Sequence, residues 1–323
     1  MSAVLGGLAL LVLLPLGVAS GHERHPLPRI GAVREVDDAD VADPAVLTYG
    51  GRYYVFWTTD WQSNVPAAVS GDRTHWQQLP DALPVLPSWA APSISMTWAP
   101  AVVAVDGHFV MYVTTEDQAT GRQCIAVAVA PSQDPAGPYT SAASEPLECQ
   151  LSLGGSIDPS VVKDAGGLHL LWKNDGNCCN IVSSLWEQDL APDGLSLVGT
   201  AHKLLTADEP WQGGVIEAPA MIRATGAVAG WWLFYSGGSW RSDDYATGLA
   251  YCKTVAGPCA EASSHPFLPS SPGLLSPGGL ETFTDGSGRT WVAFSSFVQI
   301  PSPWHPGHDY DNRVLDLAPL LTN

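Results

Sequence analysis

The sequence is poor in charge, above all in positive charge. Among its 323 residues, 14 are Lys or Arg against 32 Asp or Glu, and charged residues make up 14% of the chain. Nucleic acid is therefore not an expected partner, because binding phosphates requires a concentrated basic surface. No long run of like charges indicates a disordered tail. We expect a soluble, acidic, monomeric protein.

Long apolar stretches are also missing, with one exception at the N-terminus. Residues 4–18 are nearly all Leu, Val, Ala and Gly, and the small residues up to Gly21 suit signal peptidase. The run is shorter than the roughly 20 residues that span a bilayer, so residues 1–20 are predicted to be a signal peptide. No Lys or Arg precedes it, and an N-terminal hydrophobic anchor is the alternative. Residues 21–323 are expected to be secreted and extracellular, without a membrane partner.

The six cysteines include no Cys-x-x-Cys pair, so a zinc site of that kind is not expected. An even number in an exported chain suggests disulfides instead. Cys252 and Cys259 flank a turn-rich segment, and Cys124 and Cys149 flank a loop with Pro and Gly. The adjacent pair Cys178-Cys179 would then form a strained vicinal disulfide or stay reduced. Since six cysteines allow about 15 pairings, this connectivity is a hypothesis.

No convincing amphipathic helix is present, and apolar residues alternate with period 2 instead. Residues 52–59, 108–114 and 290–294 are aromatic and β-branched segments bounded by Gly, Asp or Pro, as strands are. Glycine (32 residues) and proline (27 residues) are spread along the mature chain. Many short strands joined by turns, in an all-β fold, are therefore predicted.

One motif recurs about every 60 residues. A short apolar segment, in most copies with Pro, precedes a Gly-containing turn and an aromatic strand, and its copies are aligned at Asp43, Ala99, Asp158, Ala218 and, more weakly, Gly278. Sheets repeated radially form a propeller, so we predict a five-bladed β-propeller as a single domain over residues 21–323. A β-sandwich gives no reason for the recurring Pro. WD repeats are shorter, about 40–45 residues, and their dipeptide signature is absent.

Three carboxylates occupy matching places in this repeat. Asp43 and Asp158 directly precede the recurring Pro, and Glu217 lies one position earlier in its copy. Because the inner strands of a propeller line its channel, these side chains are expected to converge near the axis. Asp before Pro is also common in turns, where it bonds backbone amides. Three converging carboxylates repel one another, however, and such arrangements usually have a chemical purpose.

The same segments resemble glycoside hydrolase family 43, a family of five-bladed propeller enzymes. The resemblance covers residues 38–320 and rests on four motifs: Ala-Asp-Pro-Ala-Val at 42–46, Trp-Ala-Pro at 98–100, Ile-Asp-Pro-Ser at 157–160 and Ile-Glu-Ala-Pro at 216–219. It implies that Asp43 is the general base and Glu217 the general acid, with Asp158 raising the pKa of Glu217. One acid and one base is the pair that glycoside hydrolysis requires.

The resemblance further implies a polysaccharide or oligosaccharide substrate with arabinofuranosyl or xylosyl linkages. It also implies inversion at the anomeric carbon. Asp43 and Glu217 belong to the first and fourth repeats, which favours the gap of about 6.5–9.5 Å that inverting enzymes keep between their carboxyl groups.

The fifth repeat departs from the family. Many members have Gly-Pro-Gly-His there, with an axial His that can help to hold a metal ion, whereas this chain has Ser-Pro-Gly-Gly at residues 276–279. No other His, Cys, Asp or Glu group has metal-ligand spacing along the chain. No metal and no cofactor are therefore expected.

Two further residues are predicted to contact the substrate. Trp98 shares the column of Glu217 and suits the apolar face of a sugar, although a core position is equally compatible. Arg313 resembles a late arginine of the family that reaches the substrate or Asp158, with a plain surface ion pair as the alternative. Four loop tryptophans are candidates for shaping subsites: Trp61, Trp89, Trp211 and Trp240.

Two other functions are compatible with this pattern. A retaining, fructan-active propeller would use its first Asp as the nucleophile, but its strand usually has Asn-Asp-Pro, and residues 42–44 are Ala-Asp-Pro. A non-catalytic carbohydrate-binding propeller would need sugar-binding loops rather than three converging acids. The sequence favours a hydrolase, and family analogy alone favours arabinofuranosyl substrates.

Overall fold

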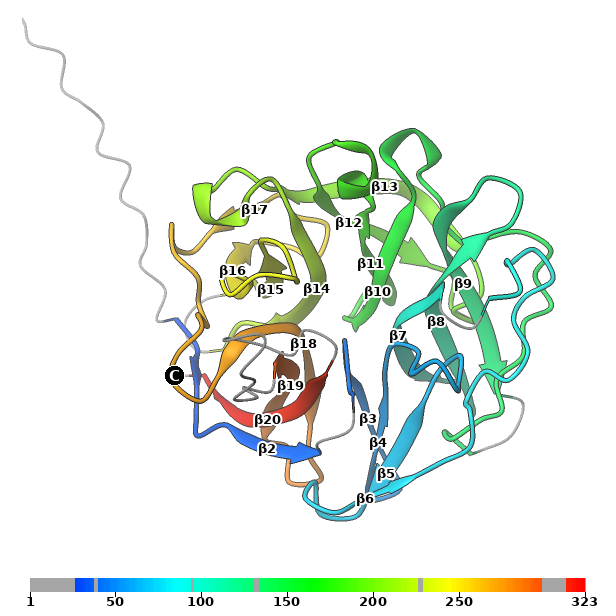
Figure 1. Cartoon of the computed structure of the whole chain (residues 1–323), viewed down its shortest axis with the longest axis horizontal. Helices are drawn as coiled ribbons and strands as arrows, with labels where there is room; N and C mark the ends of the chain where they lie inside the picture. Colours follow the sequence, from blue (N-terminus) through cyan, green and yellow to red (C-terminus); the bar gives the residue numbers. More distant parts are fainter. Residues whose placement is uncertain are drawn as a thin grey trace, which may run out of the picture.

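Five antiparallel β-sheets stand around a central axis in the computed structural model (Figure 1). The structure describes residues 27–37, 40–93, 96–130, 134–225, 229–297 and 312–322. The predicted five-bladed β-propeller is confirmed, while the predicted signal peptide lies outside the described residues. Within these ranges no α-helix occurs, and no helix has the length and apolarity needed to cross a membrane. Short 3₁₀ helices lie in the loops, among them η2 (Leu151–Leu153), η3 (Gly176–Cys179) and η4 (Pro210–Gln212).

In each blade the first strand faces the axis and the following strands step outward. Blade 1 contains β3 (Ala45–Tyr49), β4 (Arg52–Phe56), β5 (Ala67–Ser70) and β6 (Trp76–Gln78). Blade 2 contains β7 (Thr97–Val105), β8 (His108–Asp117) and β9 (Arg122–Ala130). Blade 3 contains β10 (Ser156–Lys163), β11 (Leu168–Asn174), β12 (Ser184–Leu190) and β13 (Leu197–Thr206). Blade 4 contains β14 (Ile216–Arg223), β15 (Trp231–Gly237), β16 (Ala246–Cys252) and β17 (Cys259–Glu261).

The fifth blade closes the ring by joining the two ends of the described chain. It contains β18 (Leu275–Thr284), β19 (Thr290–Phe297) and β20 (Arg313–Leu321). Two N-terminal strands, β1 (Arg29–Ile30) and β2 (Arg34–Asp37), pair with β20, and Figure 1 shows this early segment in blue beside the red last strand. Backbone hydrogen bonds between the first and last strands therefore hold the ring shut.

The hydrophobic core consists of five layers, and each layer lies between two neighbouring blades. Strand β8 shows why the sequence has period 2. Met111 packs toward blade 1 with Phe56, whereas the next residue, Tyr112, packs toward blade 3 with Trp172. Successive side chains of a strand point to opposite faces, so both faces of an inner sheet are buried.

The recurring Pro marks a β-bulge on the first strand of blades 2, 3 and 4. In blade 3, Ile157 pairs with Lys173 and Ser160 with Leu171, which leaves one extra residue on β10. A bulge bends its strand and re-aims a side chain. The first bulge residue has a left-handed φ, and the same conformation recurs in all five blades: +51° at Asp43, +44° at Ala99, +56° at Asp158, +50° at Ala218 and +62° at Gly279.

This geometry corrects the alignment of the fifth repeat by one residue. Strand β18 has two bulges, one between Leu275 and Gly278 and one between Gly278 and Glu281, and the second makes Gly279 rather than Gly278 the equivalent of Asp43. Pro277 follows the left-handed residue of the first bulge, Ser276, whereas Leu280 follows Gly279, so the Pro does not mark the register of this copy. A left-handed φ suits Gly, because it lacks the Cβ that makes this region costly.

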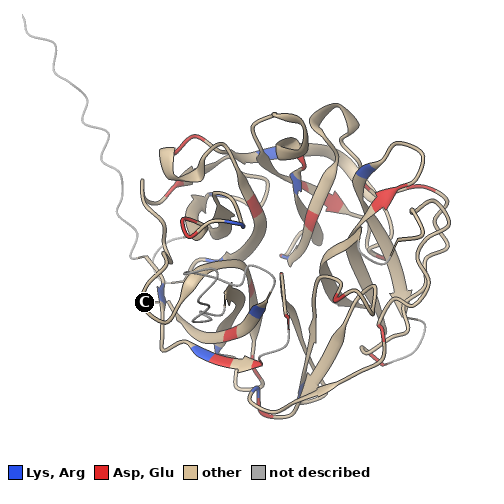
Figure 2. Ribbon diagram, in the orientation of Figure 1, with Lys and Arg blue, Asp and Glu red and all other residues tan. Residues whose placement is uncertain are grey.

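The suggested disulfides are present. Cys124 is bonded to Cys149, and Cys252 to Cys259 across the β16–β17 hairpin. The adjacent residues Cys178-Cys179 form the vicinal disulfide. Acidic residues occur all around the ring with basic residues thinly spread among them, as Figure 2 shows.

Candidate active site

A pocket of about 890 Å³ opens at the end of the propeller where the bulges lie. Residues of all five blades and their loops line it, and its size is that of a typical ligand site. All five residues predicted to act on the substrate are in its lining: Asp43, Trp98, Asp158, Glu217 and Arg313. Residues that are up to 270 positions apart (43 to 313) therefore meet in one place.

Asp43 presents a carboxylate to the pocket from the bulge of blade 1. Its Oδ2 accepts a hydrogen bond of 2.7 Å from Thr58 Oγ1, and its Oδ1 lies 3.7 Å from Arg313 Nη1. The side chain is 24% exposed, so water reaches it. This carboxylate is held in place and is accessible from the pocket.

Arg313 pairs with Asp43 rather than with Asp158, which corrects that part of the prediction. It is not a plain surface ion pair, because the side chain is only 16% exposed. The guanidinium lies over two aromatic rings, 5.2 Å from the centroid of Trp240 and 5.7 Å from that of Phe297. Cation–π contact and the ion pair together fix this positive charge at the pocket wall.

A buried lysine, which the sequence analysis missed, completes the site. In four blades a hydroxyl residue on or just after the second strand stands opposite the residue that precedes the bulge residue. These residues are Thr58, Thr114, Ser236 and Ser295. Three of these hydroxyls accept the N–H of the next blade's bulge residue, as Thr114 Oγ1 does from Asp158 at 3.1 Å. Blade 3 has Lys173 at this place. The sequence signal that could have found Lys173 is that a lysine replaces Thr or Ser at this place in the third repeat.

Lys173 changes the bonding of both neighbouring carboxylates. With no hydroxyl in blade 3, the N–H of Ala218 donates to Asp158 Oδ2 at 3.0 Å instead. Lys173 itself is fully buried, and its Nζ donates to Glu217 Oε2 at 2.8 Å. Tyr245 OH donates to Glu217 Oε1 at 2.7 Å. Glu217 is thus bonded at both oxygens while it lines the pocket.

These contacts decide which carboxylate holds a proton. Burial raises the pKa of Asp158 to about 8, and the charge of Glu217 adds to this. Burial also disfavours ionised Glu217, but Lys173 and the Tyr245 hydroxyl outweigh it, so the pKa of Glu217 is lowered. The resemblance implies a raised pKa for Glu217. The raised pKa belongs to Asp158 instead, because Lys173 and Tyr245 stabilise the ionised form of Glu217.

Aromatic side chains form part of the pocket wall. Trp98 is half-buried there, Trp61 is 72% exposed, and Trp240 lies under Arg313. The other two loop tryptophans do not reach it: Trp89 is in the core between blades 1 and 2, and Trp211 stacks on Tyr235. Cys178 of the vicinal disulfide also lines the pocket.

The axial channel behind the pocket does not fit the metal site known for the family. It holds about 30 Å³, and no imidazole is among its lining residues. Gly279 stands where the family has His, and a Cβ there would lie 2.9 Å from Asp43 Oδ1. Glu281 faces the channel instead, accepts a hydrogen bond of 3.0 Å from Ser160 Oγ, and has its pKa raised by burial to about 7.

Comparisons with known proteins point to one family. The family described as glycosyl hydrolases family 43 matches residues 36–320. An extracellular endo-α-(1→5)-L-arabinanase of Thermotoga petrophila is 34% identical over 116 residues, which are 31% of this chain and 23% of the relative. A xylosidase/arabinosidase of Bacteroides ovatus is 28% identical over 149 residues, or 41% of this chain and 42% of the relative. The matched stretches thus span less than half of either relative.

Solved structures share the fold over nearly the whole chain. A thermostable family-43 glycoside hydrolase superposes with a TM-score of 0.73 at 23% identity, covering 92% of this chain and 91% of that one. An endo-arabinase from Bacteroides thetaiotaomicron gives a TM-score of 0.69 at 21% identity, covering 88% of this chain and 95% of that one. At such identities the likeness establishes the propeller alone.

Proposed function

The chain belongs to glycosyl hydrolase family 43, and from this premise we propose that it is a secreted, inverting hydrolase of arabinofuranosyl linkages. The observation that supports this most is the meeting of Asp43, Asp158 and Glu217 in one pocket. Residues 21–323 would form a single catalytic domain behind a signal peptide of residues 1–20.

Asp43 acts as the general base in this proposal. A base must be ionised, reach water and stand opposite the bond to be broken. The Thr58 hydroxyl and the Arg313 guanidinium both orient Asp43, and the partial exposure of its side chain admits water. It would take a proton from the water that attacks the anomeric carbon.

The Asp158–Glu217 pair supplies the proton for the leaving oxygen. The two carboxylates hold one proton between them, because burial and mutual repulsion oppose a second negative charge. We assign delivery to Glu217, as the family resemblance implies, with Asp158 as the reservoir. Lys173 and Tyr245 hold Glu217 in one orientation while the proton is transferred.

The proposed substrate is an arabinan or arabino-oligosaccharide, with xylosyl linkages as the alternative. The names of the relatives, an arabinanase and a xylosidase/arabinosidase, support this class. The aromatic wall of Trp61, Trp98 and Trp240 suits the apolar faces of sugar rings. Product analysis on arabinan, arabinoxylan and xylo-oligosaccharides tests it, and hydrolysis of none of them would reject the proposal.

Asp158→Asn is expected to move the alkaline limb of the pH dependence of kcat/KM to lower pH. In the wild type this limb should lie near the pKa of about 8 that burial gives Asp158. The variant leaves Glu217 as the remaining proton site, and its pKa is lowered by Lys173 and Tyr245. The measurement is a pH–rate profile on an unactivated oligosaccharide. An unchanged alkaline limb would remove Asp158 from this role.

Lys173→Met is expected to move the same limb in the opposite direction. Loss of the buried cation raises the pKa of Glu217, so the pair keeps its proton to higher pH. The variant should also unfold more easily at neutral pH, by up to about 3–5 kcal/mol, since it strands a buried carboxylate. This stability difference should shrink in acid, where Glu217 is protonated. Tyr245→Phe, which removes only a hydrogen bond, is the milder companion, and a downward shift in both variants would contradict the assignment.

A further inference from the structure

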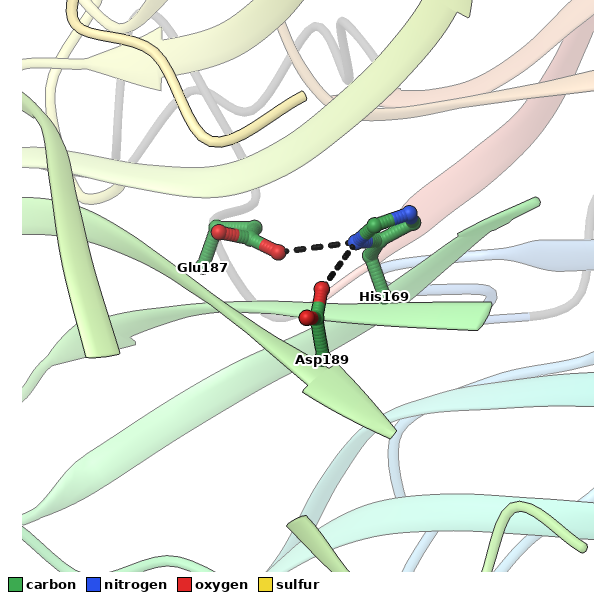
Figure 3. Close-up of side chains that lie close together, drawn as sticks. All are labelled: His169, Glu187 and Asp189. Carbon is green, nitrogen blue, oxygen red and sulfur yellow. Dashed lines mark hydrogen bonds and ion pairs between the residues drawn. The ribbon is translucent and has the colours of Figure 1, made fainter. Parts of the chain in front are cut away.

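A second group of titratable side chains lies in blade 3, away from the pocket. His169 of β11 faces Glu187 and Asp189 of β12, as Figure 3 shows. Along β11, His169 is four residues from Lys173, which corresponds to about 13 Å in a strand. The group is therefore separate from the candidate active site and independent of the proposed function.

Strand pairing brings the three side chains to one face of the blade. His169 is the register partner of Asp189, and the next position on that face pairs Leu171 with Glu187. The imidazole Nδ1 lies 2.9 Å from Glu187 Oε1 and 2.8 Å from Asp189 Oδ1. One nitrogen and two carboxylate oxygens thus converge on a single point.

Asp164 supports the imidazole from the far side. Its Oδ1 lies 3.1 Å from His169 Nε2. A carboxylate only accepts, so the imidazole donates from Nε2 to Asp164, and a proton on Nδ1 is likewise donated to Glu187 and Asp189. A metal ion between Nδ1 and these two oxygens would take the place of that proton. A carboxylate bonded to the far nitrogen is the usual support of a metal-bound histidine.

The charge of the group is balanced only in part by the protein, since one imidazole faces three carboxylates. Glu187 has a fully buried side chain, and its Oε2 has no hydrogen-bond partner in the described structure. None of the ion pairs within the described ranges brings a Lys or Arg to Asp164, Glu187 or Asp189. A buried carboxylate without compensation is costly, and a divalent ion in place of the Nδ1 proton would offset more of this negative charge than the imidazolium does.

We propose that His169, Glu187 and Asp189 bind a divalent transition-metal ion, with zinc as the best match. Zinc takes His nitrogen and carboxylate oxygen together, commonly with three protein ligands and a water. Calcium and magnesium prefer oxygen ligands alone. Asp189 is 59% exposed, so an ion and its water can enter from that side. The bound ion would tie β11 to β12 and would take no part in catalysis.

This inference departs from the expectation of no metal. The ligands are not regularly spaced in sequence, since 18 positions separate His169 from Glu187 (187 minus 169). Only the β11–β12 register assembles them.

Calorimetric titration of the metal-free full chain with zinc chloride tests the proposal. We expect one zinc ion per chain and a higher thermal unfolding midpoint with zinc. Asp189→Asn should abolish both effects, and its exposed position makes misfolding an unconvincing explanation. Asp164→Asn, which removes only the support of the histidine, should weaken binding about 10–100-fold. Glu145→Gln, at an exposed carboxylate in another loop, is the matched control and should bind like the wild type.

Three outcomes would overturn the proposal. If no zinc binds, a proton on Nδ1 balances the group. If Asp189→Asn binds zinc as well as the wild type does, the ion sits elsewhere on the surface. If calcium chloride binds with the same affinity and the same response to Asp189→Asn, the imidazole is not a ligand. Glycosidase activity at moderate temperature should be equal with and without zinc, which distinguishes this site from the pocket.

Discussion

Glu217→Gln is expected to lower kcat/KM on unactivated oligosaccharides by about 10²–10⁴-fold. The amide keeps the shape of the side chain and its contacts with Lys173 and Tyr245 but cannot deliver a proton to the leaving oxygen. Substrates with good leaving groups need less acid assistance, so their loss should be much smaller. Steady-state kinetics on a natural oligosaccharide and on an aryl glycoside measure the two losses.

The ratio of the two losses is the informative quantity. Oligosaccharide binding and the thermal unfolding midpoint serve as controls that the variant is folded, because Lys173 loses a charged partner. Equal losses on both substrates would mean that Glu217 is not the acid.

Asp43→Asn should also lower kcat/KM by about 10²–10⁴-fold, but with a different pattern. Attack by water needs the base whatever the leaving group is, so aryl glycosides and oligosaccharides should suffer alike. Asp106→Asn is a matched control, since Asp106 is an exposed aspartate that also has a left-handed φ, of +42°, at the β7–β8 turn. Activity should be unchanged in the control, and an Asp43→Asn variant that retains most activity would rule out this base.

The architecture could be predicted from the sequence because the same short segment recurs in each blade. The left-handed bulge needs the same short segment in each blade, and Asp43-Pro44 and Asp158-Pro159 made that segment visible. The equivalent of Asp43 in blade 5, Gly279, lies one residue later than the alignment predicts, because Leu280 rather than Pro follows it. The pairing of β2 with β20 was not predictable, since a half-exposed strand of four residues is too short to show an alternation of apolar and polar residues.

The site was predictable in its carboxylates but not in its electrostatics. Asp43 and Asp158 share a repeat position and Glu217 lies one residue earlier in its copy, whereas Lys173 lies on the second strand and reaches the pocket only through the packing of blade 3 against blade 4. Its charge reverses the order of the pKa values expected for Asp158 and Glu217. Likewise, the choice of Arg313 between Asp43 and Asp158 depends on the position of β20, which spacing along the chain does not encode.

The stereochemistry of the first-formed product tests the central claim most directly. The substrate is one that product analysis identifies, and proton NMR follows its anomeric signals before mutarotation. Asp43 as base and Glu217 as acid predict a first product of inverted configuration, because water attacks from the face opposite the leaving group. Release of the anomer with the configuration of the substrate would contradict this account and make Asp43 a nucleophile.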